Sequence, residues 1–232
     1  MSSKAERVQS IFSAIAPRYD LVNDVMTFRR AHAWRAKAVQ LSGAKPGMKV
    51  LDVATGTGDF AIAFKKVVGS TGQVTGVDFC AEMLVPAPAK AQALGFDIKF
   101  QQGDAMNLAF SDASFDVVSI GYGLRNVADT DRAIKELARV LVPGGTLVVL
   151  ETGRSEWPLY SAATEFYTNK IMPVVGGWLS GSRDAYRYLD ASSKEFPYGA
   201  KLVALLKSAG GFRSVKAHAL MGGVSYIYTC EK

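Results

Sequence analysis

The sequence predicts an α/β fold in which a mainly parallel β-sheet is covered by helices and closed by a C-terminal antiparallel hairpin. Short apolar runs alternate with helical stretches between residues 49 and 150, and this alternation is typical of parallel strands joined by right-handed crossovers. Two β-rich runs near the C-terminus flank a Gly-Gly turn, as in a hairpin. The 232 residues, 49% hydrophobic and 21% charged, suit one domain (1–232) with a full core.

Residues 1–45 precede the alternating pattern and are expected to form an N-terminal helical cap. Apolar residues follow i, i+3, i+4, i+7 spacing over residues 4–15, which predicts an amphipathic helix that Pro17 ends. A second helix is expected over residues 22–42. Its expected apolar contacts are Val25, Met26, Phe28 and Trp34.

The alternating region supplies the strands, because short apolar runs that end in turns suit buried parallel strands. They are expected over residues 49–54, 73–79, 98–102, 115–121 and 146–150. Helices are expected over residues 59–68, 81–94 and 130–141. In the last helix Ile134, Leu137, Val140 and Leu141 share one face, and Arg132 and Glu136 have the spacing of an i, i+4 ion pair.

The C-terminal third does not repeat the strand–helix unit. Residues 155–197 form an insertion rich in aromatic residues, Gly and Pro, and a helix is expected over about 199–209. Strands are expected over 214–220 and 224–230, around Met221-Gly222-Gly223. A parallel sheet closed by such a hairpin is the Rossmann-like architecture of class I S-adenosylmethionine-dependent methyltransferases, and differs from the six-stranded dinucleotide fold.

A glycine-rich loop lies where the first strand gives way to a helix. Gly56 and Gly58 allow the backbone to turn sharply and to approach a ligand closely. Asp78, twenty residues beyond Gly58, ends the second strand, where an acid accepts hydrogen bonds from ribose hydroxyls in this kind of fold. The run from Gly56 to Ala61 also satisfies the dinucleotide fingerprint GxGxxA, so the loop alone leaves NAD as an alternative.

Three acidic and small residues favour S-adenosylmethionine. Asp52, just before the loop, would repel a pyrophosphate but suits a cationic methionine moiety. Asp104 follows the third strand and can accept from an adenine amino group, while Ala105 leaves room for the ring. Thr57 or Asp59 can equally serve only to cap the following helix.

Several longer stretches resemble the ubiquinone/menaquinone biosynthesis C-methyltransferase family. They are Phe12 to Asp24 (FSAIAPRYDLVND), Gly103 to Leu108 (GDAMNL) and Gly121 to Val127 (GYGLRNV). The resemblance extends over nearly the whole chain, and AxxYDxxND and GLRNV are its most specific motifs. Arg139 to Gly145 (RVLVPGG) is common to many class I methyltransferases and adds little.

The resemblance implies carbon methylation of a prenylated quinol, converting demethylmenaquinol to menaquinol, with the benzoquinol step of ubiquinone synthesis as the alternative. It places Thr57, Asp78, Asp104 and Ala105 at cofactor positions. Together with the loop argument, the expected cofactor set is Asp52, Gly56, Thr57, Gly58, Asp78, Asp104, Ala105 and Gly121. The chain departs from the family where some members carry Ser at position 121, and from the general GxGxG loop at Ala54.

Carbon methylation requires an electron-rich ring, a positioned acceptor and a site for the phenolic proton. A free Arg is a poor base, so we expect Arg125 to stabilise the developing phenolate by its charge. We expect Asn126 to orient the quinol oxygen. The alternative for Arg125 is a structural ion pair with Asp24 or Asp129. Tyr19 and Asp20 are expected to close over the cofactor, with a helix-end turn capped by Asp20 as their alternative.

The prenyl tail is expected to occupy the insertion 155–197, unless this segment is a lid that packs on the core or on a dimer partner. The apolar side chains offered for a groove are Trp157, Leu159, Tyr160, Phe166, Tyr167, Ile171, Met172, Val174, Val175, Trp178 and Leu179. Such a tail requires a route from the bilayer.

The net charge of +6 favours an anionic membrane surface over nucleic acid as a partner, because no RNA-binding signature accompanies it. Arg18, Arg29, Arg30, Arg35 and Lys37 concentrate this charge near the N-terminus. No apolar run of 18 residues and no signal peptide are present, which predicts a cytoplasmic protein in peripheral contact with the inner face of the membrane. A homodimer or a biosynthetic complex is a further possibility.

No metal site is expected, since the two cysteines and two histidines are scattered. Cys80 and Cys230 are expected to pack in the core, and His32 and His218 are weak catalytic candidates. A reductase would require a Tyr-x-x-x-Lys pair, which Tyr160 and Tyr167 do not provide. A non-catalytic scaffold of a quinone-biosynthesis complex is the remaining alternative.

Overall fold

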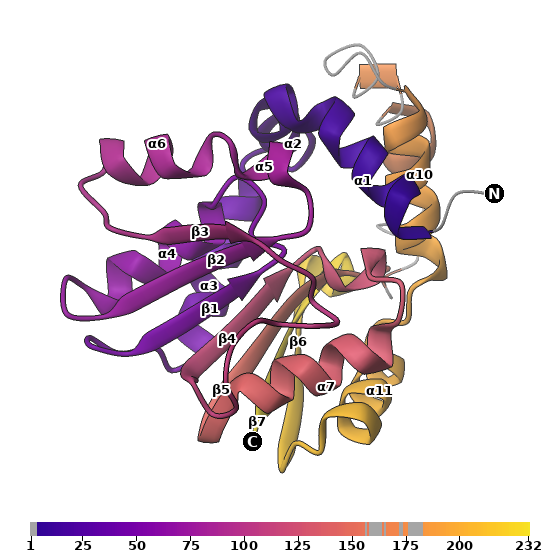
Figure 1. Cartoon of the computed structure of the whole chain (residues 1–232). Coiled ribbons are helices and arrows are strands. Elements are labelled where there is room, and N and C mark those ends of the chain that lie inside the picture. The colour runs from indigo at the N-terminus through magenta and orange to yellow at the C-terminus, as the bar shows by residue number, and fades with distance from the viewer. Residues whose placement is uncertain (1–3, 156, 158–163, 165, 172–173, 176–182) are drawn as a thin grey trace.

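The computed structural model describes residues 4–155, 157, 164, 166–171, 174–175 and 183–232. Its centre is a seven-stranded sheet with the strand order β3-β2-β1-β4-β5-β7-β6 (Figure 1). The strands are β1 Lys49–Val53, β2 Gln73–Asp78, β3 Lys99–Gln102, β4 Phe115–Gly121, β5 Leu141–Thr152, β6 Ser214–Leu220 and β7 Ser225–Glu231. Strands β1 to β5 pair in parallel, and β7 pairs antiparallel with β5 and β6. The predicted fold class is therefore confirmed.

Helices cover both faces of the sheet, because alternate strand residues point to opposite faces and both faces are apolar. On β1, Val50 joins the cluster under the first group of helices and Leu51 the cluster under the second. The first group is α3 Arg30–Leu41, α4 Asp59–Val68 and α6 Ala87–Ala93. The second is α7 Thr130–Val140 and α11 Ala200–Gly210.

The N-terminal segment forms three helices outside the sheet (Figure 1). They are α1 Lys4–Ile15, α2 Tyr19–Met26 and α3, with a 3₁₀ turn η1 Ala16–Arg18 between the first two. The first helix was predicted correctly. The single helix expected over residues 22–42 is wrong, because Phe28 and Arg29 adopt φ values of +48° and +59° and break it.

Two of the expected apolar contacts in this segment do not reach the core. Val25 and Phe28 are 42% and 72% exposed, whereas Met26 is buried. Thr27 stabilises the break, since its Oγ1 donates to the carbonyl of Asn23 and accepts from the N–H of Ala31. The break turns α3 onto the sheet and leaves α2 beside the carboxyl ends of the strands.

Two other local predictions are wrong. The helix expected over 81–94 is divided into α5 Ala81–Leu84 and α6, because Pro86 has no N–H to continue the helical ladder. The ion pair expected between Arg132 and Glu136 is replaced. Glu136 pairs with Arg139, and Arg132 donates to the carbonyl of Met106.

The C-terminal region returns to the N-terminal helices before it completes the sheet. Helix α10, Arg183–Glu195, lies alongside α1 (Figure 1). The hairpin β6–β7 turns through η4 Met221–Gly223, as the sequence predicted. No helix in the described ranges is both long and apolar enough to span a bilayer.

Candidate active site

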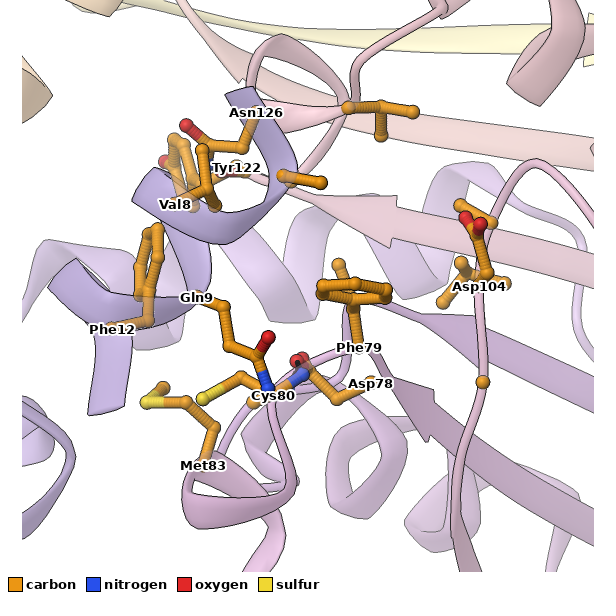
Figure 2. Close-up of a pocket in the computed structure, with 18 of the residues that line it drawn as sticks. Val8, Gln9, Phe12, Asp78, Phe79, Cys80, Met83, Asp104, Tyr122 and Asn126 are labelled. Carbon is orange, nitrogen blue, oxygen red and sulfur yellow. Dashed lines mark hydrogen bonds between the residues drawn. The ribbon is translucent and has the colours of Figure 1, made fainter. Parts of the chain in front are cut away.

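A cavity lies at the carboxyl ends of β1, β2 and β4, where ligands bind in open parallel sheets (Figure 2). Its empty space is about 820 Å³ when the open mouth and the solvent within it are included. Loops after the strands form its floor and walls. Helix α1 roofs it with Ala5, Val8, Gln9 and Phe12. The N-terminal cap is thus part of the site.

The loop after β1 is held open by left-handed backbone. Gly56 has φ +55° and borders the cavity, and its N–H donates to Asp78 Oδ2 over 2.7 Å. Gly58 has φ +85° at the start of α4 and lies outside the cavity, against Phe100 and Ala87. The two predicted glycines therefore serve different purposes, one for the ligand site and one for packing.

Both departures from the family pattern lie at closely packed positions. A Cβ at Gly121 would lie 3.0 Å from the ring of Phe60, so Phe60 fills the space where a side chain at 121 would begin. Ala54 has φ +53°, and its Cβ lies beside Gly123. A Cβ at Gly123 would approach the Ala54 Cβ to 2.4 Å, and the loops after β1 and β4 therefore meet at this point.

Two of the predicted acids border the cavity. Asp78 accepts from the N–H groups of Gly56 and Cys80, and burial raises the pKa of its carboxyl. Asp104 accepts from the N–H of Met106 over 2.8 Å. The predicted neighbour Ala105 also lines the cavity. Figure 2 shows Asp78 and Asp104 on separate strand ends with Phe79 between them.

Asp52, the third predicted acid, lies beneath the loop and not in the cavity. It is 1% exposed and accepts from Thr55 Oγ1 over 2.6 Å and from Ser119 Oγ over 2.7 Å. Burial raises the pKa of Asp52 to about 6, and these two hydrogen bonds oppose the shift. Its position suits a support for the glycine loop.

Asp20 and Thr57 join the N-terminal cap to the glycine loop. Thr57 Oγ1 donates to Asp20 Oδ1 over 2.6 Å, and Lys90 Nζ donates to Asp20 Oδ2 over 2.7 Å. Lys90 also pairs with Asp59, which in turn pairs with Arg35. This group, the cap clasp (Asp20, Thr57, Lys90, Asp59 and Arg35), connects α2, α3, α4 and α6. Neither Asp20 nor Thr57 lines the cavity.

Tyr19 does line the cavity. Its ring contacts that of Phe12 at a centroid distance of 6.3 Å. Burial raises the pKa of the Tyr19 phenol, which therefore stays protonated at neutral pH. Of the pair predicted to close over the cofactor, one residue faces the cavity and the other holds the cap in place.

Arg125 and Asn126 form the short helix η2, Leu124–Asn126, after β4. The Arg125 side chain is 8% exposed and pairs with the fully buried Glu151 at 2.5 Å. The alternative pairing with Asp24 or Asp129 is wrong: Asp24 contacts Arg29 and His32, and Asp129 caps α7. Asn126 Nδ2 donates to the carbonyl of Tyr122, and Asn126 borders the cavity.

Several cavity residues were not predicted from the sequence. Phe79, Cys80 and Met83 lie within five residues after Asp78, and Tyr122 adopts φ +56° before η2. Their nearness in sequence to Asp78 and to GLRNV was the available signal. Cys80, expected only to pack, is buried at the cavity wall between Ser13 Oγ and Glu82 Oε2.

Part of the predicted substrate groove falls outside the described residues: Leu159, Tyr160, Met172, Trp178 and Leu179. Within the described part, Tyr167 Oη donates to the carbonyl of Met26, and its ring lies 5.9 Å from that of Phe28. Val175 packs on the small cluster of Ile15, Val22 and Met26. This part of the insertion thus contacts the N-terminal helices.

Comparisons with known proteins agree with this geometry. A model of the ubiE/COQ5 methyltransferase family matches residues 1–232. The ubiquinone/menaquinone biosynthesis C-methyltransferase UbiE of Bdellovibrio bacteriovorus is 48% identical over 227 residues, covering 98% of this chain and 96% of the relative. The demethylmenaquinone methyltransferase of Staphylococcus saprophyticus is 40% identical over 226 residues, covering 97% and 96%.

Solved structures show the same architecture. A possible histamine N-methyltransferase of Thermotoga maritima has a TM-score of 0.68 at 22% identity, over 97% of this chain and 99% of the other. A methyltransferase of Aquifex aeolicus has a TM-score of 0.64 at 19% identity, over 91% and 97%. At these identities the likeness establishes the fold.

Proposed function

The chain belongs to the ubiE/COQ5 methyltransferase family, and on that premise we propose that it transfers a methyl group from S-adenosylmethionine to a ring carbon of a prenylated quinol. The carrying observation is the cavity at the strand ends, which combines two acids, several glycines and three residues of the GLRNV motif, Gly123, Asn126 and Val127. Family membership favours methyl transfer over the reductase and the scaffold. Demethylmenaquinol is the preferred acceptor and a benzoquinol the alternative.

The residues at the cavity fit S-adenosylmethionine. Asp78 would receive the ribose hydroxyls, and Asp104 the adenine amino group beside Ala105. Gly103 and Gly121 are closely packed, since a Cβ there would meet Val77 and Phe60, so the wall is shaped by backbone. Gly56 brings backbone to the cavity edge, and Tyr19 and Phe12 cover it from the cap. When bound, the sulfonium supplies the methyl group.

Arg125 and Asn126 would orient the acceptor. The charge of Arg125 is balanced by Glu151, so this residue offers a directed donor rather than a free cation. Its Nε and the Oδ1 of Asn126 are buried and have no hydrogen-bond partner among the residues that the structure describes. A quinol hydroxyl can donate and accept, and therefore can satisfy both groups. Holding the oxygen in this way places the ortho carbon for in-line attack.

The test is methyl transfer from labelled S-adenosylmethionine to short-tail demethylmenaquinol and to a short-tail benzoquinol under reducing conditions. The expected product carries the label on a ring carbon. Transfer to neither quinol, or tight binding of NAD, would exclude the proposal. The ratio of the two rates decides between the naphthoquinol and the benzoquinol.

An exposed apolar patch supports peripheral contact with the membrane. Leu21, Val25 and Phe28 are 57%, 42% and 72% exposed on and just after α2. The neighbouring insertion adds Phe166 and Val174, 62% and 58% exposed. Arg18, Arg29 and Arg30 are exposed in the same N-terminal segment. Apolar side chains beside basic ones suit insertion among anionic headgroups, where the insertion 155–197 would receive the prenyl tail.

Flotation with vesicles tests this contact. Wild type is expected to float with phosphatidylglycerol vesicles at low salt, less at high salt, and not with neutral vesicles. Phe28→Asp should reduce flotation, whereas Leu94→Asp should not, because Leu94 is 51% exposed but follows the end of α6 that lies away from α2 (Figure 1). Equal loss in both variants would argue against a defined patch. Analytical ultracentrifugation of the free protein gives its molecular mass in solution, which tests whether it forms the homodimer considered from the sequence.

A further inference from the structure

A second hollow lies between α1, η2, α10 and α11, beside the roof of the cavity. Helix α1 faces the cavity with Val8 and Phe12 and faces this hollow with Arg7 and Ile11. Figure 1 shows α1 and α10 side by side at this place. The short helix η2 borders both spaces, with Asn126 at the cavity and Arg125 at the hollow. The two sites therefore meet at η2.

Three buried side-chain polar atoms lack a hydrogen-bond partner in the described part of the chain, and all three belong to this junction. They are Arg125 Nε, Asn126 Oδ1 and Tyr188 Oη. Buried polar groups are nearly always paired, and each unpaired one destabilises the free protein. The junction thus offers one donor, one acceptor and one hydroxyl that can act as either. This combination suits a polar ligand.

Tyr188 reaches this junction from α10, far from η2 in sequence. Helix α10 contacts η2, and Tyr188 and Arg125 both line the hollow. Burial raises the pKa of Tyr188, and the charges of Arg125 and Arg7 oppose the shift. Arg7 lies over the ring, with its guanidinium carbon 5.8 Å from the ring centroid. These contacts hold the ring while the hydroxyl stays unpaired.

We infer that Tyr188 is a substrate-binding residue of the acceptor site, where its hydroxyl and Arg125 Nε together contact a quinol oxygen. The inference rests on the proposed function and deepens it, because it adds a residue from the C-terminal segment to the GLRNV pair. Oxygen is the matching ligand atom, since a quinol hydroxyl accepts from Arg125 and exchanges a hydrogen bond with a phenol.

The test is Tyr188→Phe, which removes only the hydroxyl. Binding of reduced short-tail demethylmenaquinol is measured in the presence of S-adenosylhomocysteine, so that no turnover occurs. The Kd for the quinol is expected to rise about 5- to 30-fold, as for one lost hydrogen bond, while affinity for S-adenosylmethionine stays unchanged. The Tm of the free protein should be unchanged or higher, because an unpaired buried hydroxyl has been removed.

Tyr228→Phe is the matched control. Its hydroxyl accepts from the N–H of Gly199 over 2.7 Å inside the core, so its loss should lower Tm and leave quinol binding unchanged. Wild-type quinol affinity in Tyr188→Phe would overturn the inference. So would a fall in Tm like that of the control, with binding lost only in proportion to unfolded protein. If wild type binds no quinol, the proposed function fails as well.

Discussion

Replacing Arg125 by Ala should lower both the stability of the protein and its rate of methyl transfer. Glu151 is 0% exposed, and the substitution removes its only ion-pair partner in the described ranges. Its carboxylate would keep hydrogen bonds from the N–H and Oγ1 of Thr152 and from the N–H of residue 125. Breaking a buried pair from one side typically costs about 3–5 kcal/mol, and because these hydrogen bonds remain, we expect a loss of about 3 kcal/mol.

A loss of that size predicts a Tm lower by about 6–12 °C for a chain of this length. Urea unfolding gives the free energy directly, and methyl transfer is then measured well below the new Tm, per folded molecule. We expect kcat to fall a further ~10²-fold, the usual effect of one lost preorganised donor. If Arg125→Ala unfolds like wild type, the buried pair contributes nothing to stability and this prediction is wrong. Unchanged kcat per folded molecule would leave Arg125 a structural residue.

Three other variants test the rest of the site. Asp78→Ala should weaken S-adenosylmethionine binding about 10- to 100-fold by titration calorimetry, through lost charge-assisted hydrogen bonds, and unchanged affinity would exclude the ribose assignment. For Asp52→Asn, the free energy of unfolding relative to wild type should increase as pH rises from 4 to 7.5. Because the folded pKa is raised from 3.8 to about 6, wild type loses up to about 3 kcal/mol across that window. The same difference in unfolding free energy between variant and wild type at both pH values, measured by urea unfolding, would contradict this. Lys90→Ala should speed cofactor dissociation several-fold, because among the described residues Asp20 then keeps only its hydrogen bond from Thr57. The effect should shrink at high salt, where wild type already exchanges faster.

Most of the fold could be predicted because its signals are local. Apolar runs and turn residues determine strands such as Phe115–Gly121, which has the predicted limits. The failures have local causes of another kind. Phe28 and Arg29 adopt a left-handed backbone conformation that residues other than glycine rarely adopt. Because no glycine is present at this turn, the sequence gives no signal for it. Burial of Phe28 was expected from its residue type, but the break leaves the side chain exposed.

The site was less predictable because sequence spacing does not determine which way a side chain points. Asp52 and Asp78 both stand at strand ends, yet only Asp78 borders the cavity. The partner of Arg125 is Glu151, a charge in the middle of an apolar strand, which no motif identified. Tyr188 was invisible for the same reason, since only the tertiary arrangement brings α10 to η2.

The contact between Ala54 and Gly123 means that the two loops share room for a single methyl group. At present that methyl sits on Ala54, whose φ of +53° suits glycine better, while Gly123 has an ordinary φ of −103°. Gly123→Ala alone should therefore be poorly tolerated. Combined with Ala54→Gly it moves the methyl across the gap, leaving a contact of 3.2 Å with Ile120. The double variant should therefore lose less stability than the sum of the losses in the two single variants. A double-mutant cycle measures this coupling.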